Sequence, residues 1–438
     1  MPSPKPEPLS PPLSIWLVNP FDDVPGEGLP AMRYWSLARA LTLRGHDVTW
    51  WSANWSHRRK TARSTPLGIV EDEGFAVRLV AVRPYGKNVS LTRLASHRDF
   101  GRNFERLANE TVASGQLERP DLIVASLPPL EGPEAAHRVA RRLDAALVID
   151  VQDLWPETFE RLVPGPAFLR RILAACLLRG MRERRRAVLA AADAVSATCR
   201  THLDAIAAEL RPDAPRHVCL LGSYLQEFPE PPAIIDAVPA IGAGPRQPEP
   251  PPLECIYAGS LEIGQDLDAL LSAARQLSAN RIAVTIHVAG TGSLERMLRR
   301  AADSLPGPCR IEMHGLLARP AYVALLSRCD VGLVLVKPES RVVLPNKACD
   351  YAAAGLAIVN SLPGELDRLI EAHAAGLSYA AGDGAALARA LATLAGDRRR
   401  LPALRLGARR LAAAEFDRER IYSMFSDWVE SAWAKRPV

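Results

Sequence analysis

The stretch that decides the fold is VVLPNKACDYAAAGLAIVNSLPGE, residues 342–365. It follows DVGLVLV (330–336), a β-branched apolar run that is typical of a buried parallel strand. Pro345 suits the first turn of a helix, where its missing N–H costs nothing, and Gly355 suits a left-handed helix end. The stretch therefore predicts a strand, a helix over 348–354 and a further strand, which is the repeating unit of a parallel sheet.

The start of that helix is suited to binding an anion. A helix that opens at the carboxyl end of a parallel strand presents free N–H groups and a positive dipole end. Lys347, next to Asn346, adds a positive charge for phosphate, and Asp350, one turn on, offers a carboxylate for hydroxyl groups. Phosphate beside a diol is the outline of a sugar nucleotide. The alternatives are a solvated lysine and an aspartate that only complements the helix dipole.

The motif PNKxxDYxAAG (345–355), followed by a strand and Gly-Glu, resembles the retaining family 4 glycosyltransferases of the GT-B fold. Within that family it is most similar to the branch that builds bacterial surface polysaccharides and exopolysaccharides. The resemblance covers nearly the whole chain and implies an α/β fold, with two Rossmann-like, doubly wound parallel-sheet domains that face each other across a cleft. One departure is Val342, which stands where many relatives carry the first glutamate of an E-x7-E pair; Asp350 occupies the second position.

The composition is that of a soluble globular protein. The chain has 438 residues, of which 48% are hydrophobic, and its net charge of +5 is too small to indicate a nucleic-acid partner. Its seven cysteines lie in apolar segments without zinc-ligand spacing, which favours reduced core cysteines in a cytoplasmic protein. No apolar run reaches the roughly 18 residues of a membrane span, and the first residues are too polar for a signal peptide. We expect a cytoplasmic protein, either free or peripheral on the inner face of the cytoplasmic membrane.

Alternating strand and helix patterns predict two doubly wound domains. The expected divisions are a disordered N-terminus (1–12), an N-terminal acceptor domain (13–228), a proline-rich linker (229–252), a nucleotide-sugar-binding domain (253–415) and a C-terminal helix (416–438). The resemblance implies that this last helix returns to the first domain. Residues 55–103 are expected to be basic and irregular, apart from one short strand over 77–82.

Donor contacts are expected in the second domain, as the resemblance implies. Gly259 and Ser260 stand in a strand-to-helix turn where relatives often carry cations, and glycine there permits close backbone approach. In this chain the charge for the diphosphate would come from Lys347 and Arg341 instead. For Ser260 a plain connecting turn is an equal alternative.

Further donor candidates follow along the second domain. Gly290 and Gly292 form a Gly-x-Gly turn after a strand, which resembles the turn over the nucleotide in these enzymes. Glu365 either reaches the donor or caps the next helix. Asp266 and Asp268 spell a metal–diphosphate signature of a different glycosyltransferase fold, but helix capping explains them better. We therefore expect no metal and no cofactor besides the donor substrate.

Acceptor contacts are expected in the first domain. Gly26 and Gly28 belong to a loop after the first strand, whose spacing is not the dinucleotide fingerprint. Asp153 and Glu157 follow another strand, in the DxxDLWPE pattern of the resembled branch, where a carboxylate can take a hydroxyl proton or orient the acceptor. Strand-end capping and salt bridges to the arginines downstream are the alternative. His97, in the basic stretch, is a weak substitute for the histidine that many relatives place near the anomeric carbon.

One basic amphipathic helix is predicted over 167–189. Its apolar stripe includes Ile172 and Leu173, and arginines crowd its other sides, among them Arg170, Arg171, Arg182, Arg185 and Arg186. Such a helix is typical of binding to a membrane surface. The alternative is a core-packed helix with a solvated basic face.

Together these features predict a retaining, metal-independent hexosyltransferase. It would move a sugar from a nucleoside-diphosphate sugar, such as a UDP-sugar, to a lipid-linked or oligosaccharide acceptor in cell-surface polysaccharide synthesis. Lys347 and Asp153 are the catalytic candidates. The alternatives are a nucleotide-sugar 2-epimerase of the same fold and a non-catalytic partner protein that binds nucleotide-sugar or lipid.

Overall fold

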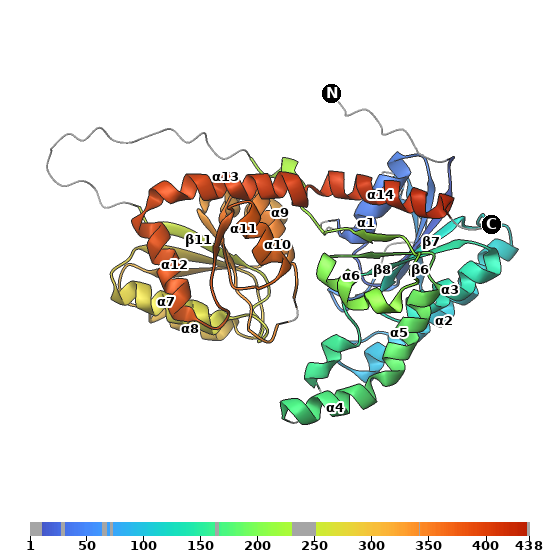
Figure 1. The fold of residues 1–438 in the computed structure, drawn as a ribbon, viewed down its shortest axis with the longest axis horizontal. Helices are drawn as coiled ribbons and strands as arrows, with labels where there is room; N and C mark the ends of the chain where they lie inside the picture. The colour runs from blue at the N-terminus through green and yellow to red at the C-terminus, as the bar shows by residue number, and fades with distance from the viewer. Residues whose placement is uncertain are drawn as a thin grey trace. The chain divides into compact units, whose positions relative to one another are not determined.

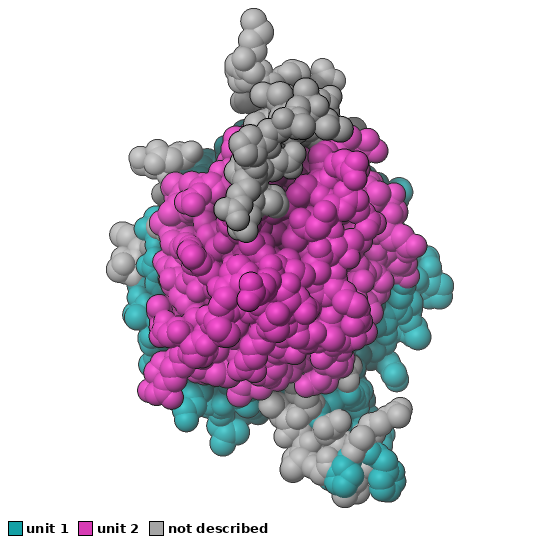
Figure 2. Space-filling model, turned by 90° about the vertical axis from the view of Figure 1, so that its left-hand side faces the viewer, with its two compact units in different colours: residues 1–220, 419–438 teal, residues 221–418 magenta. Residues whose placement is uncertain are grey.

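The computed structural model describes residues 11–27, 31–63, 68–70, 73–162, 166–229, 251–340 and 342–435. The chain divides into two compact units (Figure 2). Unit 1 comprises Met1–Leu220 with Glu419–Val438, and unit 2 comprises Leu221–Arg418. Each unit is built on one main sheet with helices on both faces (Figure 1), so the α/β fold of two Rossmann-like units is confirmed.

Unit 1 contains an eight-stranded sheet in the order β10-β9-β8-β7-β1-β2-β6-β5, parallel except for the pair β5–β6. Its strands are β1 (Ser14–Val18), β2 (Asp47–Ala53), β5 (Gly68–Val70), β6 (Phe75–Val80), β7 (Leu122–Leu127), β8 (Ala146–Val151), β9 (Ala194–Ala197) and β10 (Arg216–Val218). A small antiparallel ribbon joins β3 (Trp55–Ser56) to β4 (Thr61–Ala62). The strand order reverses between β1 and β7, and ligands of such sheets bind beyond the carboxyl ends of the strands at this switch point.

The helices of unit 1 are α1 (Arg33–Leu43), α2 (Leu91–Ala113), α3 (Glu131–Leu143), α4 (Ala167–Leu177), α5 (Arg179–Ala191), α6 (Arg200–Ile206) and α14 (Arg418–Ala434). Successive residues of a strand point to opposite faces, so β1 contributes to two cores. Ile15 and Leu17 pack with residues of α1 and α14, while Trp16 and Val18 pack with residues of α2 and α3. The C-terminal helix thus completes one face of the sheet of unit 1.

Unit 2 contains a fully parallel six-stranded sheet in the order β13-β12-β11-β14-β15-β16. Its strands are β11 (Leu253–Ala258), β12 (Val284–Ala289), β13 (Arg310–Gly315), β14 (Val331–Val334), β15 (Ala357–Asn360) and β16 (Gly376–Ser378). Its helices are α7 (Leu267–Ala279), α8 (Glu295–Asp303), α9 (Arg319–Arg328), α10 (Asn346–Ala353), α11 (Glu365–Ala372), α12 (Gly384–Gly396) and α13 (Leu401–Leu411). Here the switch point lies between β11 and β14.

The stretch that decides the fold forms β14, α10 and β15 in the expected order. Helix α10 packs closely on β14, since a Cβ at Gly332 would lie 2.4 Å from the ring of Tyr351. Gly355 follows the helix with φ of 69°, in the left-handed conformation expected for it. A buried core of α7, α12 and the strands, including Tyr257 and Leu387, fills the other face of the sheet (Figure 1).

Two local predictions are wrong. The irregular stretch ends at Leu91, where α2 begins, because Phe100, Phe104 and Ala108 recur at helical spacing and are buried in a core that α3 shares. Ser90 starts α2 by accepting a hydrogen bond from the N–H of Arg93 (3.2 Å). The single helix over 167–189 is two helices, α4 and α5, separated at Leu178.

Some expected divisions fall outside the described residues, namely most of the N-terminus (1–12) and most of the linker (229–252). The expected domain bounds stay a prediction, although the two compact units meet in sequence at Leu221. Among the described helices, none combines the length and the apolar character needed to cross a bilayer.

Candidate functional site

Three loops at the carboxyl end of the sheet of unit 2 are joined by backbone hydrogen bonds. The N–H of Gly259, after β11, donates to the carbonyl of Ala289 (2.9 Å), and the N–H of Gly290, after β12, donates to that of Gly315 (2.7 Å). Leu261 donates to the carbonyl of Thr291 (2.9 Å). The loops therefore form one fixed surface beside the switch point between β11 and β14.

The glycines of these loops are required by space and by backbone conformation. A Cβ at Gly290 would lie 1.8 Å from the carbonyl oxygen of Gly259, and one at Gly292 would lie 2.4 Å from that of Leu261. Gly259 and Gly290 have φ of 143° and 155°, which side chains disfavour. The Gly-x-Gly turn is therefore a tight backbone surface of the kind that phosphates approach closely.

Lys347 reaches over this surface from the first turn of α10. Its Nζ lies 4.0 Å from the ring centroid of Tyr257, and a Cβ at Gly259 would be only 2.9 Å from it. Burial lowers the pKa of Lys347 to about 7. No described carboxylate forms an ion pair with this ammonium group. A cation at a helix start, beside tightly packed glycines, is suited to an anionic ligand.

Asp350, one turn further along α10, is already held by protein groups. Arg319 donates to both carboxylate oxygens (2.8 and 3.1 Å), and the Ser223 hydroxyl donates to one of them (2.6 Å). Arg319 also pairs with Glu227 at 2.6 Å, and these two acids keep the pKa of Arg319 above its usual value despite burial. The role of Asp350 towards ribose hydroxyls stays a prediction. To bind a hydroxyl, the carboxylate would have to give up one of its bonds to Arg319 or Ser223, or share an oxygen between the two.

The other donor candidates lie around the same edge. The carbonyl of Ser260 accepts a hydrogen bond from the Tyr257 hydroxyl (2.9 Å), which fixes the turn. Glu365 is buried at the start of α11, directly after Gly364 with φ of 96°. Asn346 is the exposed first residue of α10, and Arg341 lies outside the described residues.

The capping interpretation of the DxD sequence is confirmed for its first aspartate. Asp266 accepts a hydrogen bond from the N–H of Ala269 at the start of α7 (3.2 Å) and another from Gly382 (2.8 Å). The exposed Asp268 instead lies 3.6 Å from the ammonium of Lys337. Both carboxylates thus have structural partners.

One group of side chains in the described part of the chain has the composition of a metal site. His287, Glu312 and His314 bring ligand atoms within 4.8 Å of one another on β12 and β13. The two imidazoles already share a hydrogen bond (Nδ1 of His287 to Nε2 of His314, 2.9 Å), and His287 also contacts Glu254 at 2.8 Å. Since these groups satisfy one another, the arrangement is explained as a hydrogen-bonded network on neighbouring strands.

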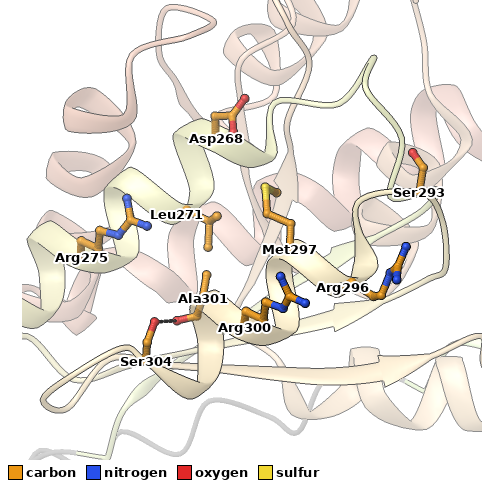
Figure 3. A pocket seen from close by; sticks show the side chains of 9 residues that line it. All are labelled: Asp268, Leu271, Arg275, Ser293, Arg296, Met297, Arg300, Ala301 and Ser304. Atoms are coloured by element: carbon orange, nitrogen blue, oxygen red, sulfur yellow. Dashed lines mark hydrogen bonds between the residues drawn. The ribbon is translucent and has the colours of Figure 1, made fainter.

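A hollow of about 760 Å³ lies between α7 and α8 (Figure 3). Its walls carry Asp268, Arg275, Arg296, Arg300 and Ser293, together with apolar groups. Of these residues only Ser293 belongs to the glycine-rich loops, through its bonds to Glu262 (2.6 and 3.0 Å). The hollow is therefore separate from the surface that Lys347 covers.

In unit 1, both acidic candidates after β8 have structural partners. The Asp153 carboxylate accepts hydrogen bonds from the N–H of Leu154 (2.8 Å) and the hydroxyl of Thr158 (3.2 and 3.3 Å). Glu157 pairs with Arg185 and, at 3.5 Å, with Arg182. The salt-bridge alternative therefore describes Glu157, and Asp153 caps the turn that follows.

The expectation that Arg185 faces a membrane is wrong. Its side chain is buried, and it also donates to both oxygens of Glu209 (3.0 and 2.6 Å), because two acids from other segments converge on it. Arg182 pairs with Glu160 at 2.9 Å, whereas Arg186 is exposed. The side chains of Arg170 and Arg171 lie outside the described residues.

His97 was expected in an irregular basic stretch, and this expectation is wrong because His97 lies on α2. It is buried, at 3% exposure, with its ring 5.4 Å from that of Phe21 and 5.7 Å from that of Trp155. Burial and the nearby charge of Arg93 lower the pKa of His97 to about 3. Gly26 is exposed with φ of 85°, and Gly28 lies outside the described residues.

The sequence interpretation missed a group of side chains that the structure brings together around His97. We call it the Arg93 cluster, and it consists of His57, Lys60, Tyr85, Arg93, His97 and Trp155. The signal was present as aromatic and cationic residues interleaved over 55–97, within the stretch predicted to be irregular.

Comparison with known proteins identifies both units. Residues 252–397 match a family model described as glycosyl transferases group 1, and residues 30–222 match one described as a glycosyl transferase 4-like domain. Each of the two stretches therefore resembles a glycosyltransferase domain. The group 1 domain contains the glycine-rich loops and Lys347, and the 4-like domain contains the Arg93 cluster.

A curated relative of this chain is WcaL of Salmonella typhimurium, provisionally named a colanic acid biosynthesis glycosyltransferase. The two are 28% identical over 184 residues, which are 41% of this chain and 45% of the relative. The chain thus matches less than half the length of that relative.

Solved glycosyltransferase structures share the fold. HepE of Anabaena in complex with UDP-glucose aligns with a TM-score of 0.62 at 15% identity, covering 96% of this chain and all of that one. Sucrose-phosphate synthase of Thermosynechococcus elongatus aligns with a TM-score of 0.69 at 14% identity, covering 97% and 100%. WaaG, involved in lipopolysaccharide biosynthesis, aligns with a TM-score of 0.60 at 14% identity, covering 94% and 98%. At these identities the likeness shows the GT-B fold alone.

Proposed function

We propose that this chain is an enzyme that transfers a sugar from a nucleoside-diphosphate sugar to a saccharide in cell-surface polysaccharide synthesis. The observation that carries the proposal is the Lys347 ammonium above the glycine-tight loops after β11 and β12. The UDP-glucose in the HepE structure, and the colanic acid name of WcaL, support the donor class and the kind of product.

The geometry suggests how the leaving group is stabilised. As the glycosidic bond breaks, negative charge develops on the departing diphosphate. The Lys347 charge and the first N–H groups of α10 are fixed before the reaction, so they stabilise this charge without reorganising. Such a preorganised donor contributes about 2.7–4 kcal/mol to catalysis in other enzymes. No metal ion is needed in this scheme.

Retention of the anomeric configuration is part of the proposal, on the basis of the motif around Lys347. The departing phosphate would take the acceptor proton on the same face of the sugar. Asp153 is proposed to orient the acceptor hydroxyl, since its carboxylate is held at the carboxyl end of β8 by Leu154 and Thr158.

A peripheral membrane location is supported by the surface of α4. Phe168 and Leu177 are 72% and 70% exposed, and Ile172 is 51% exposed, while the exposed Arg179 and Arg186 follow on α5. Apolar side chains beside cations suit an anionic lipid surface, where a lipid-linked acceptor would lie. Phe168→Ser with Leu177→Ser should abolish binding to anionic vesicles, whereas the exposed Leu43→Ser on α1 should not. Equal binding by all three proteins would remove the membrane proposal.

The central experiment screens the purified chain against a panel of nucleoside-diphosphate sugars. The correct donor at 100 times its Kd should stabilise the protein by about 2.7 kcal/mol. That donor is then incubated with and without saccharide acceptors, and the anomeric configuration of the product is read by NMR. Consumption of the donor to an epimer without acceptor would mean an epimerase, which neither matched domain family describes. If no nucleotide sugar stabilised or reacted with the protein, the proposal would fail.

A further inference from the structure

The Arg93 cluster lies at the carboxyl ends of the strands of unit 1. His57 and Lys60 stand in the turn between β3 and β4, and Arg93 and His97 lie on the first two turns of α2. Trp155 follows β8. This edge is where an open parallel sheet holds its ligands, close to the switch point between β1 and β7.

Arg93 is enclosed by aromatic rings. The carbon of its guanidinium lies 5.3 Å from the ring centroid of Phe21, 5.4 Å from that of Trp155 and 6.0 Å from that of Tyr85. One terminal nitrogen donates to the carbonyl of Asn88 (2.6 Å), whereas its buried Nε has no hydrogen-bond partner. The rings fix the guanidinium in place and leave donor capacity unused.

Lys60 points at the same group of rings. Its Nζ lies 4.7 Å from the centroid of Tyr85 and 3.3 Å from Nδ1 of His57, which also contacts the Tyr85 hydroxyl at 2.6 Å. Lys60 itself has φ of 56°, a left-handed conformation that a lysine adopts only at an energetic cost. Strain of this kind persists where the surrounding contacts fix a side chain in one place.

The positive charges of the cluster are not neutralised by the protein. No described carboxylate pairs with Lys60 or Arg93, and the nearby acids Asp23 and Glu27 lie 3.5 Å from cations of their own, Arg58 and Arg63 respectively. Burial and mutual repulsion lower the pKa of Lys60, and those of His57 and His97 to about 3, so both imidazoles are neutral. Partly buried cations without a counter-charge are costly, and an anionic ligand would remove that cost.

His97 gives an independent indication of a ligand. It is 97% buried, yet neither ring nitrogen has a hydrogen-bond partner among the described residues. A neutral imidazole has one N–H to donate and one nitrogen to accept with. Buried polar groups without partners are rare, and a ligand bound at this edge of the sheet would supply the partner that His97 lacks.

We propose that the Arg93 cluster binds a phosphate or diphosphate group of the acceptor substrate. This inference rests on the proposed function and specifies its acceptor as a phosphorylated saccharide. Two cations, Lys60 and Arg93, match the charge of a phosphate dianion or a diphosphate, whereas a carboxylate would leave one of them unpaired. The neutral imidazoles supply further N–H donors, and the aromatic rings hold the two cations in fixed positions from which they can bind phosphate oxygens.

The test is calorimetric titration of the full chain with inorganic pyrophosphate, with the donor site saturated by UDP. Pyrophosphate should bind the wild-type protein, and Arg93→Gln and Lys60→Gln should each weaken it at least tenfold. Arg98→Gln is the matched control, because Arg98 is an exposed arginine of the same helix, and it should leave binding unchanged. Circular dichroism confirms that each variant is folded.

Each other outcome overturns the inference. If both cluster variants bound pyrophosphate as tightly as the wild-type protein does, these residues would not be the site that binds it. Loss of pyrophosphate binding when UDP is present would assign it to the donor site, and glucuronate binding as well as pyrophosphate would make the occupant a carboxylate. The proposed function is judged separately, since donor stabilisation and donor turnover depend on Lys347 and not on this titration.

Discussion

The two candidate binding regions of this chain are built in different ways. In unit 2 the candidate ligand surface is backbone: Gly290 and Gly292 lie so close to neighbouring carbonyls that no side chain fits, and the Lys347 ammonium lies against Gly259. In unit 1 the Arg93 cluster is side chains, with cations and imidazoles beside the rings of Phe21, Tyr85 and Trp155, which come from three separate segments. A surface made of backbone suits a diphosphate group, which is the same in every nucleoside-diphosphate donor. A surface made of side chains can change its residues to suit a different acceptor. If the two proposed sites are right, the side-chain region in unit 1 is the one where specificity can change.

The sharpest test of this contrast is Lys347→Ala, which should lower turnover about 100- to 1,000-fold by removing a preorganised charge at the leaving group. Lys337→Ala is the matched control, since among the described residues this lysine of the same unit pairs with the exposed Asp268 at 3.6 Å and with no other carboxylate. Steady-state kinetics with the donor found by the screen measures both. Wild-type turnover in a folded Lys347→Ala protein would break the assignment of the donor side.

A second test compares glycines of the two regions. Gly290→Ala should destabilise unit 2 by at least about 3 kcal/mol, because strained φ and a Cβ 1.8 Å from the Gly259 carbonyl oxygen combine. Gly26→Ala in unit 1 has the same kind of positive φ, 85°, but no atom within 4 Å, so about 1 kcal/mol is expected. Urea unfolding of each variant measures the two costs. Equal costs would mean that the loops of unit 2 are not tight.

A third test concerns two neighbouring arginines of α5, Arg185 and Arg186. Arg185→Ala should destabilise unit 1 by about 2–3 kcal/mol, since it removes the cation that Glu209 pairs with and leaves Glu157, among the described residues, with only Arg182 at 3.5 Å. The neighbouring Arg186→Ala, at an exposed position, should stay within about 0.5 kcal/mol. The free energies of unfolding in denaturant distinguish a structural arginine from one that is free to meet a membrane. A larger loss for Arg186→Ala would reverse the two roles.

The smallest expected effect is a pH dependence confined to the donor side. Burial lowers the pKa of free Lys347 to about 7, so the ammonium is charged below that pH and loses its proton above it. Affinity for the nucleotide sugar should therefore be highest below about pH 7 and fall by at most about tenfold per unit above it, until the raised pKa of the bound state is reached. Calorimetry from about pH 6 to 9 measures this, and Lys347→Ala should remove the dependence.

Much of the local structure of the candidate site in unit 2 could be predicted from sequence because its signals are local. A strand, a helix start with Pro345, Asn346 and Lys347, and a Gly-x-Gly turn are each read from a few consecutive residues. The capping role of Asp266 could be read in the same way. Parallel strands then bring the carboxyl-end loops together, whatever lies between them.

The contacts of Arg185 and of the Arg93 cluster could not be predicted in this way, because they join residues far apart in the chain. Nothing local to Arg185 indicates Glu209, and nothing local to Arg93 indicates Trp155. The helix α2 is hard to recognise in the sequence because it has many polar residues and follows a basic stretch, although its buried positions have helical spacing. Residue types were informative there, but their pairing required the fold.

Helix α14 has a consequence for how this protein is made. Phe425 and Val429 of this helix cover strands of unit 1 that are translated before the whole of unit 2. The apolar face of those strands is therefore uncovered while unit 2 is being translated. The nascent chain therefore exposes an apolar face of unit 1 until its last helix is made, and a chaperone that binds apolar surface would be needed for the part made first.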